Sequence, residues 1–253
     1  MNFQSFIDEL EKRHLADLRF SEVTRALRAL SSAYVERRES ALADHKALDG
    51  AGKRAAFALY YGPLHFLLVQ HIIKEIGATL ASGTVIDLGC GTGVAGAAIA
   101  TSTTPPLRVA GFDTHPWTLD EARFTYKAFG LKSDVHRAHA AKTRFPADTS
   151  VIVAAFVVNE LNEKDRGNLL ESLKAVVRLK PDATGNLQKH ILIVEPISQR
   201  ISPWWDDWAG EFTRMGGRAD VWKARVDLPP LVKRLATSSG LRPEMLTARS
   251  LFL

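Results

Sequence analysis

The chain has 253 residues, of which 46% are hydrophobic and 24% are charged, and this balance excludes a disordered or collagen-like chain. The formal net charge of +5 at pH 7 suits a polyanionic partner without requiring one. The single cysteine, Cys90, excludes an intramolecular disulfide framework and a cysteine-cluster metal centre.

Neither a secretory signal nor a membrane-spanning helix is indicated by the sequence. Residues 1–14 lack a basic start followed by an apolar core. Apolar runs such as Val151–Val158 are far shorter than the ~20 residues that a membrane helix needs. No set of His, Cys and Asp residues has the spacing of a metal site. We therefore expect a cytoplasmic protein with no membrane partner and no metal.

Residues 1–80 have the apolar spacing of helices. Three stripes carry this pattern: Phe3, Phe6, Ile7 and Leu10; Val23, Leu27, Leu30 and Tyr34; and Leu64, Leu67, Leu68, His71 and Ile72. Gly62 and Pro63 are expected to interrupt or start the third helix. We predict an N-terminal helical cap over residues 1–80.

From residue 84 onward, short β-branched runs alternate with helical patterns. The predicted strands are 84–88, 107–112, 134–138, 151–156, 190–194 and 246–253, and the predicted helices are 94–101, 116–129, one that Asn162 and Asp165 cap, and 231–236. Such alternation indicates a parallel sheet with crossover helices. We predict that residues 81–253 form one α/β domain.

The segment Val85–Gly93 predicts a buried strand that runs into three glycines at alternate positions, Gly89, Gly91 and Gly93. Glycines let the backbone turn sharply and approach a ligand closely. Asp113 follows twenty residues after Gly93, at the end of the next predicted strand, where a carboxylate can accept hydrogen bonds from a ribose diol. The pattern indicates a nucleoside-containing cofactor.

Two cofactor classes fit this pattern. Gly91, Gly93 and Gly96 satisfy the dinucleotide fingerprint G-x-G-x-x-G. Asp87, two positions before the first glycine, completes a D-x-G-x-G-x-G pattern that resembles motif I of the class I S-adenosylmethionine (SAM)-dependent methyltransferases. This resemblance implies that Asp87 lies near the cationic methionine end of SAM, a place where a pyrophosphate would be an unlikely neighbour.

This resemblance covers about residues 80–253 and implies a Rossmann-like α/β fold, a seven-stranded, mostly parallel sheet whose last strand is antiparallel. It implies SAM as the cofactor and S-adenosylhomocysteine (SAH) as the product. The cofactor-binding residues that it implies are Asp87, Gly89, Cys90, Gly91, Gly93, Asp113 and Thr114. Where this superfamily often has an acidic residue for adenine, the chain reads Arg137-Ala138-His139, so we expect backbone groups or His139 to contact adenine.

Asn159, Glu160 and Glu195 are the candidate catalytic residues, because they follow the fourth and fifth predicted strands, where open α/β sheets bind ligands. Both glutamates can orient or deprotonate a substrate, or instead cap a loop. With Tyr60 and Tyr61, these residues resemble the ribosomal small-subunit methyltransferase-like family. Two departures are that Ile197 replaces the glycine of that family's E-P-G and that its cysteine-rich metal cluster is absent.

Trp205 and Trp222 are the candidate substrate residues of the tryptophan-rich stretch 197–227. Trp204, Trp208 and Phe212 recur at i, i+4 and i+8, which predicts a helix face packed on the sheet, and Trp205 and Trp222 fall off this stripe. Tyr60 and Tyr61 can close over SAM as part of a lid or pack in the core.

Three hypotheses remain open for the substrate. The basic balance and the ribosomal resemblance favour ribosomal RNA or the small ribosomal subunit, with binding that weakens steeply with salt. The helical cap favours a small molecule in a closed pocket of a few hundred Å³. A SAM-binding assembly factor with little turnover is the third. The oligomeric state is not indicated.

Overall fold

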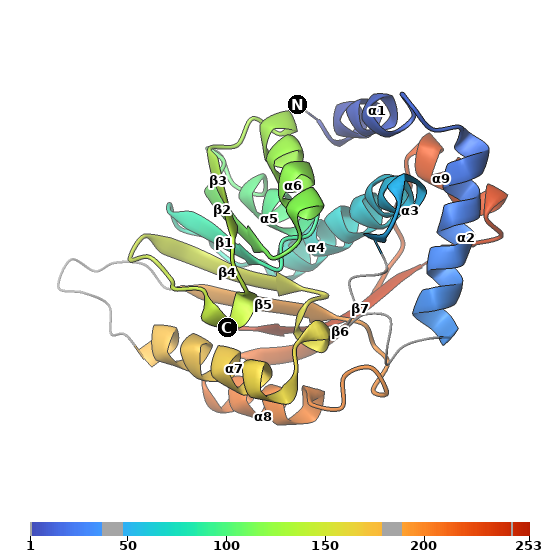
Figure 1. Ribbon diagram of the computed structural model, residues 1–253. Coiled ribbons are helices and arrows are strands. Elements are labelled where there is room, and N and C mark those ends of the chain that lie inside the picture. Colours follow the sequence, from blue (N-terminus) through green and yellow to red (C-terminus); the bar gives the residue numbers. More distant parts are fainter. Residues whose placement is uncertain (1, 37–47, 179–188, 244) are drawn as a thin grey trace.

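The computed structural model describes residues 2–36, 48–178, 189–243 and 245–253, which are arranged around one seven-stranded sheet (Figure 1). The strands are β1 (Thr84–Leu88), β2 (Arg108–Asp113), β3 (Ser133–Arg137), β4 (Thr149–Ala155), β5 (His190–Glu195), β6 (Arg218–Ala224) and β7 (Leu246–Phe252). Their order is β3-β2-β1-β4-β5-β7-β6. β1 to β5 pair in parallel, whereas β7 is antiparallel to both β5 and β6. This topology confirms the predicted fold class.

Helices cover both faces of the sheet. α4 (Gly62–Ile76), α5 (Val94–Ala100) and α6 (Pro116–Ala128) lie on one face, and α7 (Glu163–Arg178) and α8 (Trp205–Arg214) on the other (Figure 1). Successive strand residues point to opposite faces, so Val151 and Val153 of β4 join the core under α4 and α5, whereas Ile152 and Ala154 join the core under α7 and α8.

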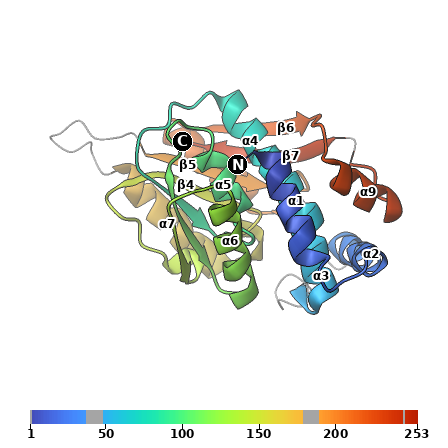
Figure 2. The ribbon, with the colours of Figure 1, turned by 90° about the horizontal axis from the view of Figure 1, so that it is seen from above.

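The N-terminal helices gather at one side of the sheet. They are α1 (Phe3–His14), α2 (Phe20–Glu36) and α3 (Ala51–Ala56), and α9 (Pro230–Ser238) lies beside α2 (Figure 2). Arg28 of α2 donates a hydrogen bond to the carbonyl of Ser238 at the end of α9. Residues of α1, α2 and α4 share one hydrophobic core with the sheet, so the predicted helical cap packs directly on the α/β domain.

The helix that contains Gly62 and Pro63 is continuous from Ala51 to Ile76, because a π-helical turn, η2 (Phe57–Tyr61), precedes α4. The N–H group of Gly62 donates to the carbonyl of Phe57, five residues earlier. This wider turn accommodates Pro63, which has no N–H group to donate. Of the two predicted alternatives, the structure shows the start of an α-helix at Gly62, and the π-turn joins α4 to α3 without an interruption.

By length and composition alone, Ala51–Ile76 would be able to cross a membrane, with a mean hydropathy of 1.3 over its most apolar window. In the folded protein 61% of that window is buried. Its apolar character therefore serves the core, since α4 packs against α5 and the sheet.

The stretch 197–227 contains α8 and the edge strand β6. Trp204, Trp208 and Phe212 are all buried against the sheet, which confirms the predicted packing face. β6 was not predicted, because its exposed and half-buried positions carry a mixture of polar and apolar residues. Asn162 caps α7 as predicted, since its Oδ1 accepts a hydrogen bond from the N–H group of Asp165 at 2.9 Å.

Candidate functional site

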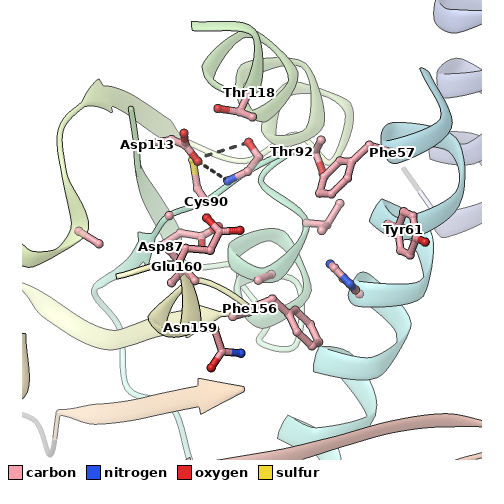
Figure 3. A pocket seen from close by; sticks show the side chains of 18 of the residues that line it. Phe57, Tyr61, Asp87, Cys90, Thr92, Asp113, Thr118, Phe156, Asn159 and Glu160 are labelled. Carbon is pink, nitrogen blue, oxygen red and sulfur yellow. Dashed lines mark hydrogen bonds between the residues drawn. The ribbon is translucent and has the colours of Figure 1, made fainter. Parts of the chain in front are cut away.

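A pocket of about 680 Å³ lies at the carboxyl ends of the central strands (Figure 3). One side is formed by the loop after β1 and by the ends of β2, β3 and β4, and the other by the helix that runs through η2 into α4. Residues of the predicted site that line it are Tyr61, Asp87, Gly89, Cys90, Gly91, Asp113, Thr114, His139, Asn159 and Glu160. The structure thus brings most of the predicted site residues to one cavity.

The three glycines of the loop after β1 all have positive φ angles, of 58°, 52° and 77° for Gly89, Gly91 and Gly93, a region that favours glycine. A Cβ atom on Gly89 would lie 2.2 Å from Cγ2 of Val157, and one on Gly93 would lie 2.9 Å from Cα of Ala122. A Cβ atom on Gly91 would meet nothing closer than 4.0 Å, and Gly91 lines the pocket.

The glycines therefore have different roles. Gly89 and Gly93 allow the loop to pack against its neighbours, and Gly91 keeps the pocket open. Gly93 is not among the residues that line the pocket, so contact between Gly93 and the cofactor stays a prediction.

Two carboxylates hold the loop in place. Oδ2 of Asp87 accepts hydrogen bonds of 2.9 Å from the N–H group of Gly96 and from the hydroxyl of Tyr126, and burial raises the pKa of Asp87 to about 7. Oδ2 of Asp113 accepts a hydrogen bond of 2.9 Å from the N–H group of Gly91 (Figure 3). Both side chains also line the pocket, where they can meet a cation or a sugar hydroxyl.

Two buried polar atoms of the pocket lining, Oγ1 of Thr92 and Nδ1 of His139, have no hydrogen-bond partner in the described part of the protein. Buried polar groups are nearly always hydrogen-bonded, so both atoms point to a ligand with polar groups. Together with the glycine cradle, they fit a nucleoside cofactor. Cys90 does not fit a nucleophile, because burial raises the pKa of its thiol well above the ordinary value.

Glu160 lies in the short 3₁₀ turn η4 (Val158–Glu160) after β4, and its side chain is exposed to the pocket. The surrounding protein partly removes the Glu160 carboxylate from bulk water, and this desolvation, together with the charge of Asp113, raises the pKa of Glu160 to about 7. A carboxylate with a pKa near the working pH is suited to general acid–base chemistry.

Glu195 is fully buried at the end of β5 and does not line the pocket. Its carboxylate accepts hydrogen bonds from the N–H groups of Val158, at 2.8 Å, and Asn159, at 3.3 Å, and from the side-chain amide of Asn159. Of the two roles that the sequence left open for Glu195, its burial and these hydrogen bonds favour the capping of a loop over contact with the substrate. Glu195 thereby positions the turn that carries Glu160.

Three of the predicted substrate residues lie outside the pocket. Tyr60 of η2 is buried in the core. Trp205, the first residue of α8, is also buried, and the guanidinium of Arg249 lies over its ring at 4.2 Å. Trp222 donates a hydrogen bond of 2.8 Å to Oγ of Ser250. Core packing, one of the two roles left open for Tyr60, is therefore the one that the structure shows, and the positions of Trp205 and Trp222 do not support a substrate role. Tyr61 alone of the four lines the pocket.

Sequence reasoning missed the apolar side of the pocket. Phe57, Leu64, His65 and Leu68 come from the helix through η2 and α4, and Phe156 comes from the end of β4. The spacing of 57, 61 and 65 at i, i+4 and i+8 was a usable signal for a common face, but the pattern does not say which face meets the sheet. Among the described residues, no group of three or more His, Cys, Asp or Glu residues is placed to hold a metal.

Comparison with known proteins relates part of the chain to methyltransferases. Residues 85–180 match the family model of a methyltransferase domain. No curated protein matches the chain.

Solved structures share the fold. A proposed O-methyltransferase from Nostoc punctiforme is 14% identical, with a TM-score of 0.54 over 95% of this chain and 71% of that chain. The mitomycin 7-O-methyltransferase MmcR is 14% identical, with a TM-score of 0.51 over 100% of this chain and 73% of that chain. The magnesium protoporphyrin IX methyltransferase of Synechocystis, solved with bound SAM, is 13% identical, with a TM-score of 0.48 over 91% and 95%.

The sheet order, the glycine motif after β1 and the family match to residues 85–180 agree with one another. Residues 85–180 therefore carry a methyltransferase domain, and the loop after β1 in that domain resembles the SAM-binding motif of class I methyltransferases.

Proposed function

We propose that this methyltransferase modifies a small molecule that is enclosed in the pocket beside SAM. The observation that carries the proposal is that one cavity is lined both by the glycine loop and by an apolar face of the helix that runs through η2 into α4. Pockets of this volume, mostly apolar with a few polar groups, are typical of small-molecule sites.

The charges of the pocket support a small molecule over RNA. Among the described residues that line it there is no lysine or arginine, and the acidic ones are Asp87, Asp113 and Glu160. Binding of RNA depends on lysine and arginine side chains that neutralise its phosphates. Ribosomal RNA remains the second candidate, because the net charge of +5 and the resemblance of Asn159 and Glu160 to the ribosomal small-subunit methyltransferase-like family favour it.

In this proposal the cofactor lies along the glycine loop. Asp113 accepts hydrogen bonds from the ribose hydroxyls, and Asp87 faces the charged methionine end. Asp165 lies 3.8 Å from Nε2 of His139, which favours a proton on Nε2 and leaves the unpartnered Nδ1 to accept a hydrogen bond from the adenine amino group. Oγ1 of Thr92, which has no hydrogen-bond partner among the described residues, lines the same pocket.

When bound, SAM supplies a methyl group on a positively charged sulfur: the acceptor atom forms the new bond to carbon, and the electron pair of the carbon–sulfur bond returns to sulfur. The protein's part is to align the acceptor and to exclude water, and positioning of this kind is worth roughly 7–11 kcal/mol. Glu160 accepts the acceptor's proton, because its carboxylate faces the pocket and makes no hydrogen bond with another described side chain.

The proposal is tested with SAM carrying a labelled methyl group. The purified protein is offered small ribosomal subunits in one reaction and the low-molecular-weight fraction of a cell extract in another, at two salt concentrations, and Asp113→Ala serves as the inactive control. We expect label in the small-molecule fraction, at a rate that changes little with salt. Label in the RNA, with binding that weakens steeply with salt, would overturn the proposal in favour of ribosomal RNA.

A further inference from the structure

The part of the pocket that the cofactor-binding loop leaves unused has a wall of aromatic side chains. Phe57, Tyr61 and His65 lie on one face of the helix that runs through η2 into α4 and all line the pocket. Figure 3 shows Phe57 and Tyr61 on the helix side of the cavity, facing the loop that carries Thr92. The aromatic wall and the glycine loop therefore face the same space.

Phe156 extends this wall from the sheet. Its ring stacks on the imidazole of His65, with centroids 4.1 Å apart and an angle of 21° between the planes. Its φ angle is 61°, and it is the one residue other than glycine with a positive φ in the described chain. A bulky side chain in this region is strained, and such strain gathers at ligand sites. The backbone of Phe156 is held by a hydrogen bond of 2.8 Å from its N–H group to the carbonyl of Val194.

The wall is uncharged at neutral pH. Burial lowers the pKa of His65 to about 4, so its imidazole is neutral. The ionisable acids that line the pocket lie on the side of the loop and the strand ends, at Asp87, Asp113 and Glu160. An anionic acceptor would face these carboxylates without a lysine or arginine among the described lining residues to offset them.

The base also constrains the acceptor. A phenolic hydroxyl, with an ordinary pKa of about 10 as in tyrosine, gives up its proton far more readily than an aliphatic hydroxyl does. A carboxylate such as Glu160 is matched to the more acidic of the two. Flat rings, in turn, gain about 0.5–1.5 kcal/mol from packing on aromatic side chains beyond the area that they bury.

We propose that the methyl acceptor is a neutral aromatic compound with a ring hydroxyl, and that its ring packs against Phe156 and His65. This inference rests on the proposed small-molecule function and names the substrate class of the same site. In it, Phe156 and His65 determine specificity, and Glu160 accepts the ring hydroxyl's proton as the oxygen–methyl bond forms.

Binding calorimetry in the presence of saturating SAH tests the inference without turnover. Three probes separate these properties: naphthol is planar and neutral, decahydronaphthol keeps the hydroxyl but loses the aromatic plane, and naphthoate keeps the plane but has a charged carboxylate in place of the hydroxyl. We expect naphthol to bind at least about 10-fold more tightly than either of the others. Equal binding of naphthol and decahydronaphthol, or tighter binding of naphthoate, would overturn the proposal, as would no binding of naphthol.

Two variants test whether the acceptor's ring packs against Phe156 and His65. Phe156→Leu and His65→Leu keep an apolar side chain but remove the aromatic face, so each is expected to weaken naphthol about 3–10-fold, the equivalent of the ring-packing contribution. Phe124→Leu, on α6 and outside the pocket, is the matched control and should leave naphthol binding unchanged. Unchanged naphthol binding in both pocket variants would place the ring elsewhere and refute the inference.

The affinity for SAH separates this inference from the proposed function. An unchanged SAH affinity in each variant shows that the fold and the cofactor site are intact. If the labelled methyl group reaches small molecules but naphthol does not bind, only the aromatic class is wrong. If the label reaches RNA, the proposed function itself fails.

Discussion

The side-chain amide of Asn159 donates a hydrogen bond to the buried carboxylate of Glu195, and its oxygen accepts one of 3.1 Å from Nε1 of Trp204. The chain of donors therefore runs in one direction, from Trp204 through Asn159 to Glu195. Because an indole N–H can only donate, the far end of this chain must be an acceptor. The turn that carries Glu160 is thereby fixed between β4, β5 and α8.

This direction predicts that Glu195→Gln is destabilising although the two side chains have nearly the same shape. The new NH₂ group would face the NH₂ group of Asn159, and flipping Asn159 would set its donors against Trp204. We expect the free energy of unfolding to fall by about 1–3 kcal/mol, the usual cost of a buried unpaired polar group. A second change, Trp204→Phe, frees Asn159 to flip, so in a double-mutant cycle the Glu195→Gln cost should shrink. Strictly additive costs would contradict the directional network.

Glu160→Gln should remove the general base and leave the cofactor site intact. General-base catalysis typically accelerates a reaction by about 10²–10⁴-fold. We therefore expect the turnover number, measured with the acceptor that methyl labelling identifies, to fall by that factor. A base works in its ionised form, so the wild-type rate should rise with pH through about 7, the pKa to which burial raises Glu160, and the variant's profile should be flat over that range. Glu163→Gln, on the exposed start of α7, is the control. A variant that kept the wild-type pH profile would exclude Glu160 as the base.

Gly89→Ala and Gly91→Ala should fail in different ways. The new methyl group on Gly89 would overlap Val157, at 2.2 Å, so Gly89→Ala should lower the melting temperature strongly. A methyl group on Gly91 meets no neighbour closer than 4.0 Å. Gly91→Ala should therefore lower the free energy of unfolding only by the backbone strain, about 1–2 kcal/mol. The methyl group projects into the cofactor pocket, so Gly91→Ala should fold and lose SAH binding. Thermal unfolding and calorimetry with SAH measure both effects, and tight SAH binding by Gly91→Ala would show that the cofactor lies elsewhere.

Asp113→Asn should weaken SAH by about 10–100-fold, because hydrogen bonds to a charged group are worth about 1.5–3 kcal/mol. The carboxylate accepts hydrogen bonds from the N–H groups of both Gly91 and His115, and Asn can accept only one of them, so the melting temperature of the variant is measured beside its SAH affinity. Asp120→Asn, an exposed position on α6, should bind SAH as the wild type does. Equal SAH affinity in both variants would remove Asp113 from the cofactor site.

The link between α1 and α6 should depend on pH. Glu121 is buried, and Nε of Arg13 at 2.9 Å and Nε2 of His14 at 3.0 Å contact its carboxylate. Burial alone would raise the pKa of Glu121, but these two partners outweigh it and lower the pKa. A depressed pKa means that the carboxylate stabilises the fold above the unfolded-state pKa of about 4.3, and that this stability is lost as the pH falls through the folded-state pKa.

We therefore expect Glu121→Gln to lower the free energy of unfolding by about 1–3 kcal/mol at pH 7 and by much less near pH 3. Glu75→Gln, at an exposed position of α4, should change neither value. Chemical denaturation of the three proteins at the two pH values measures the difference. A Glu121→Gln cost that is the same at both would contradict an ionic link.

Much of the fold, and the cofactor side of the candidate site, were predictable from local sequence pattern. The alternation of strands and helices after residue 84 follows from hydrophobic periodicity, and Gly89, Gly91 and Asp113 stand at fixed offsets from a strand end, where the backbone geometry of a nucleotide-binding loop demands those residue types. β6 escaped prediction because an edge strand has few buried positions to impose a period of two.

The sequence by itself determined the chemistry of the cofactor, because the residues that carry it are neighbours in one short strand–loop–helix segment. The tertiary structure alone decided what surrounds the acceptor. It turned Glu195 into a buried support, moved Trp205 and Trp222 away from the pocket, and set His65 of a distant helix against Phe156. Such contacts join residues far apart in the chain, and they depend on which face of each helix packs on the sheet, a choice that spacing along a single sequence leaves open.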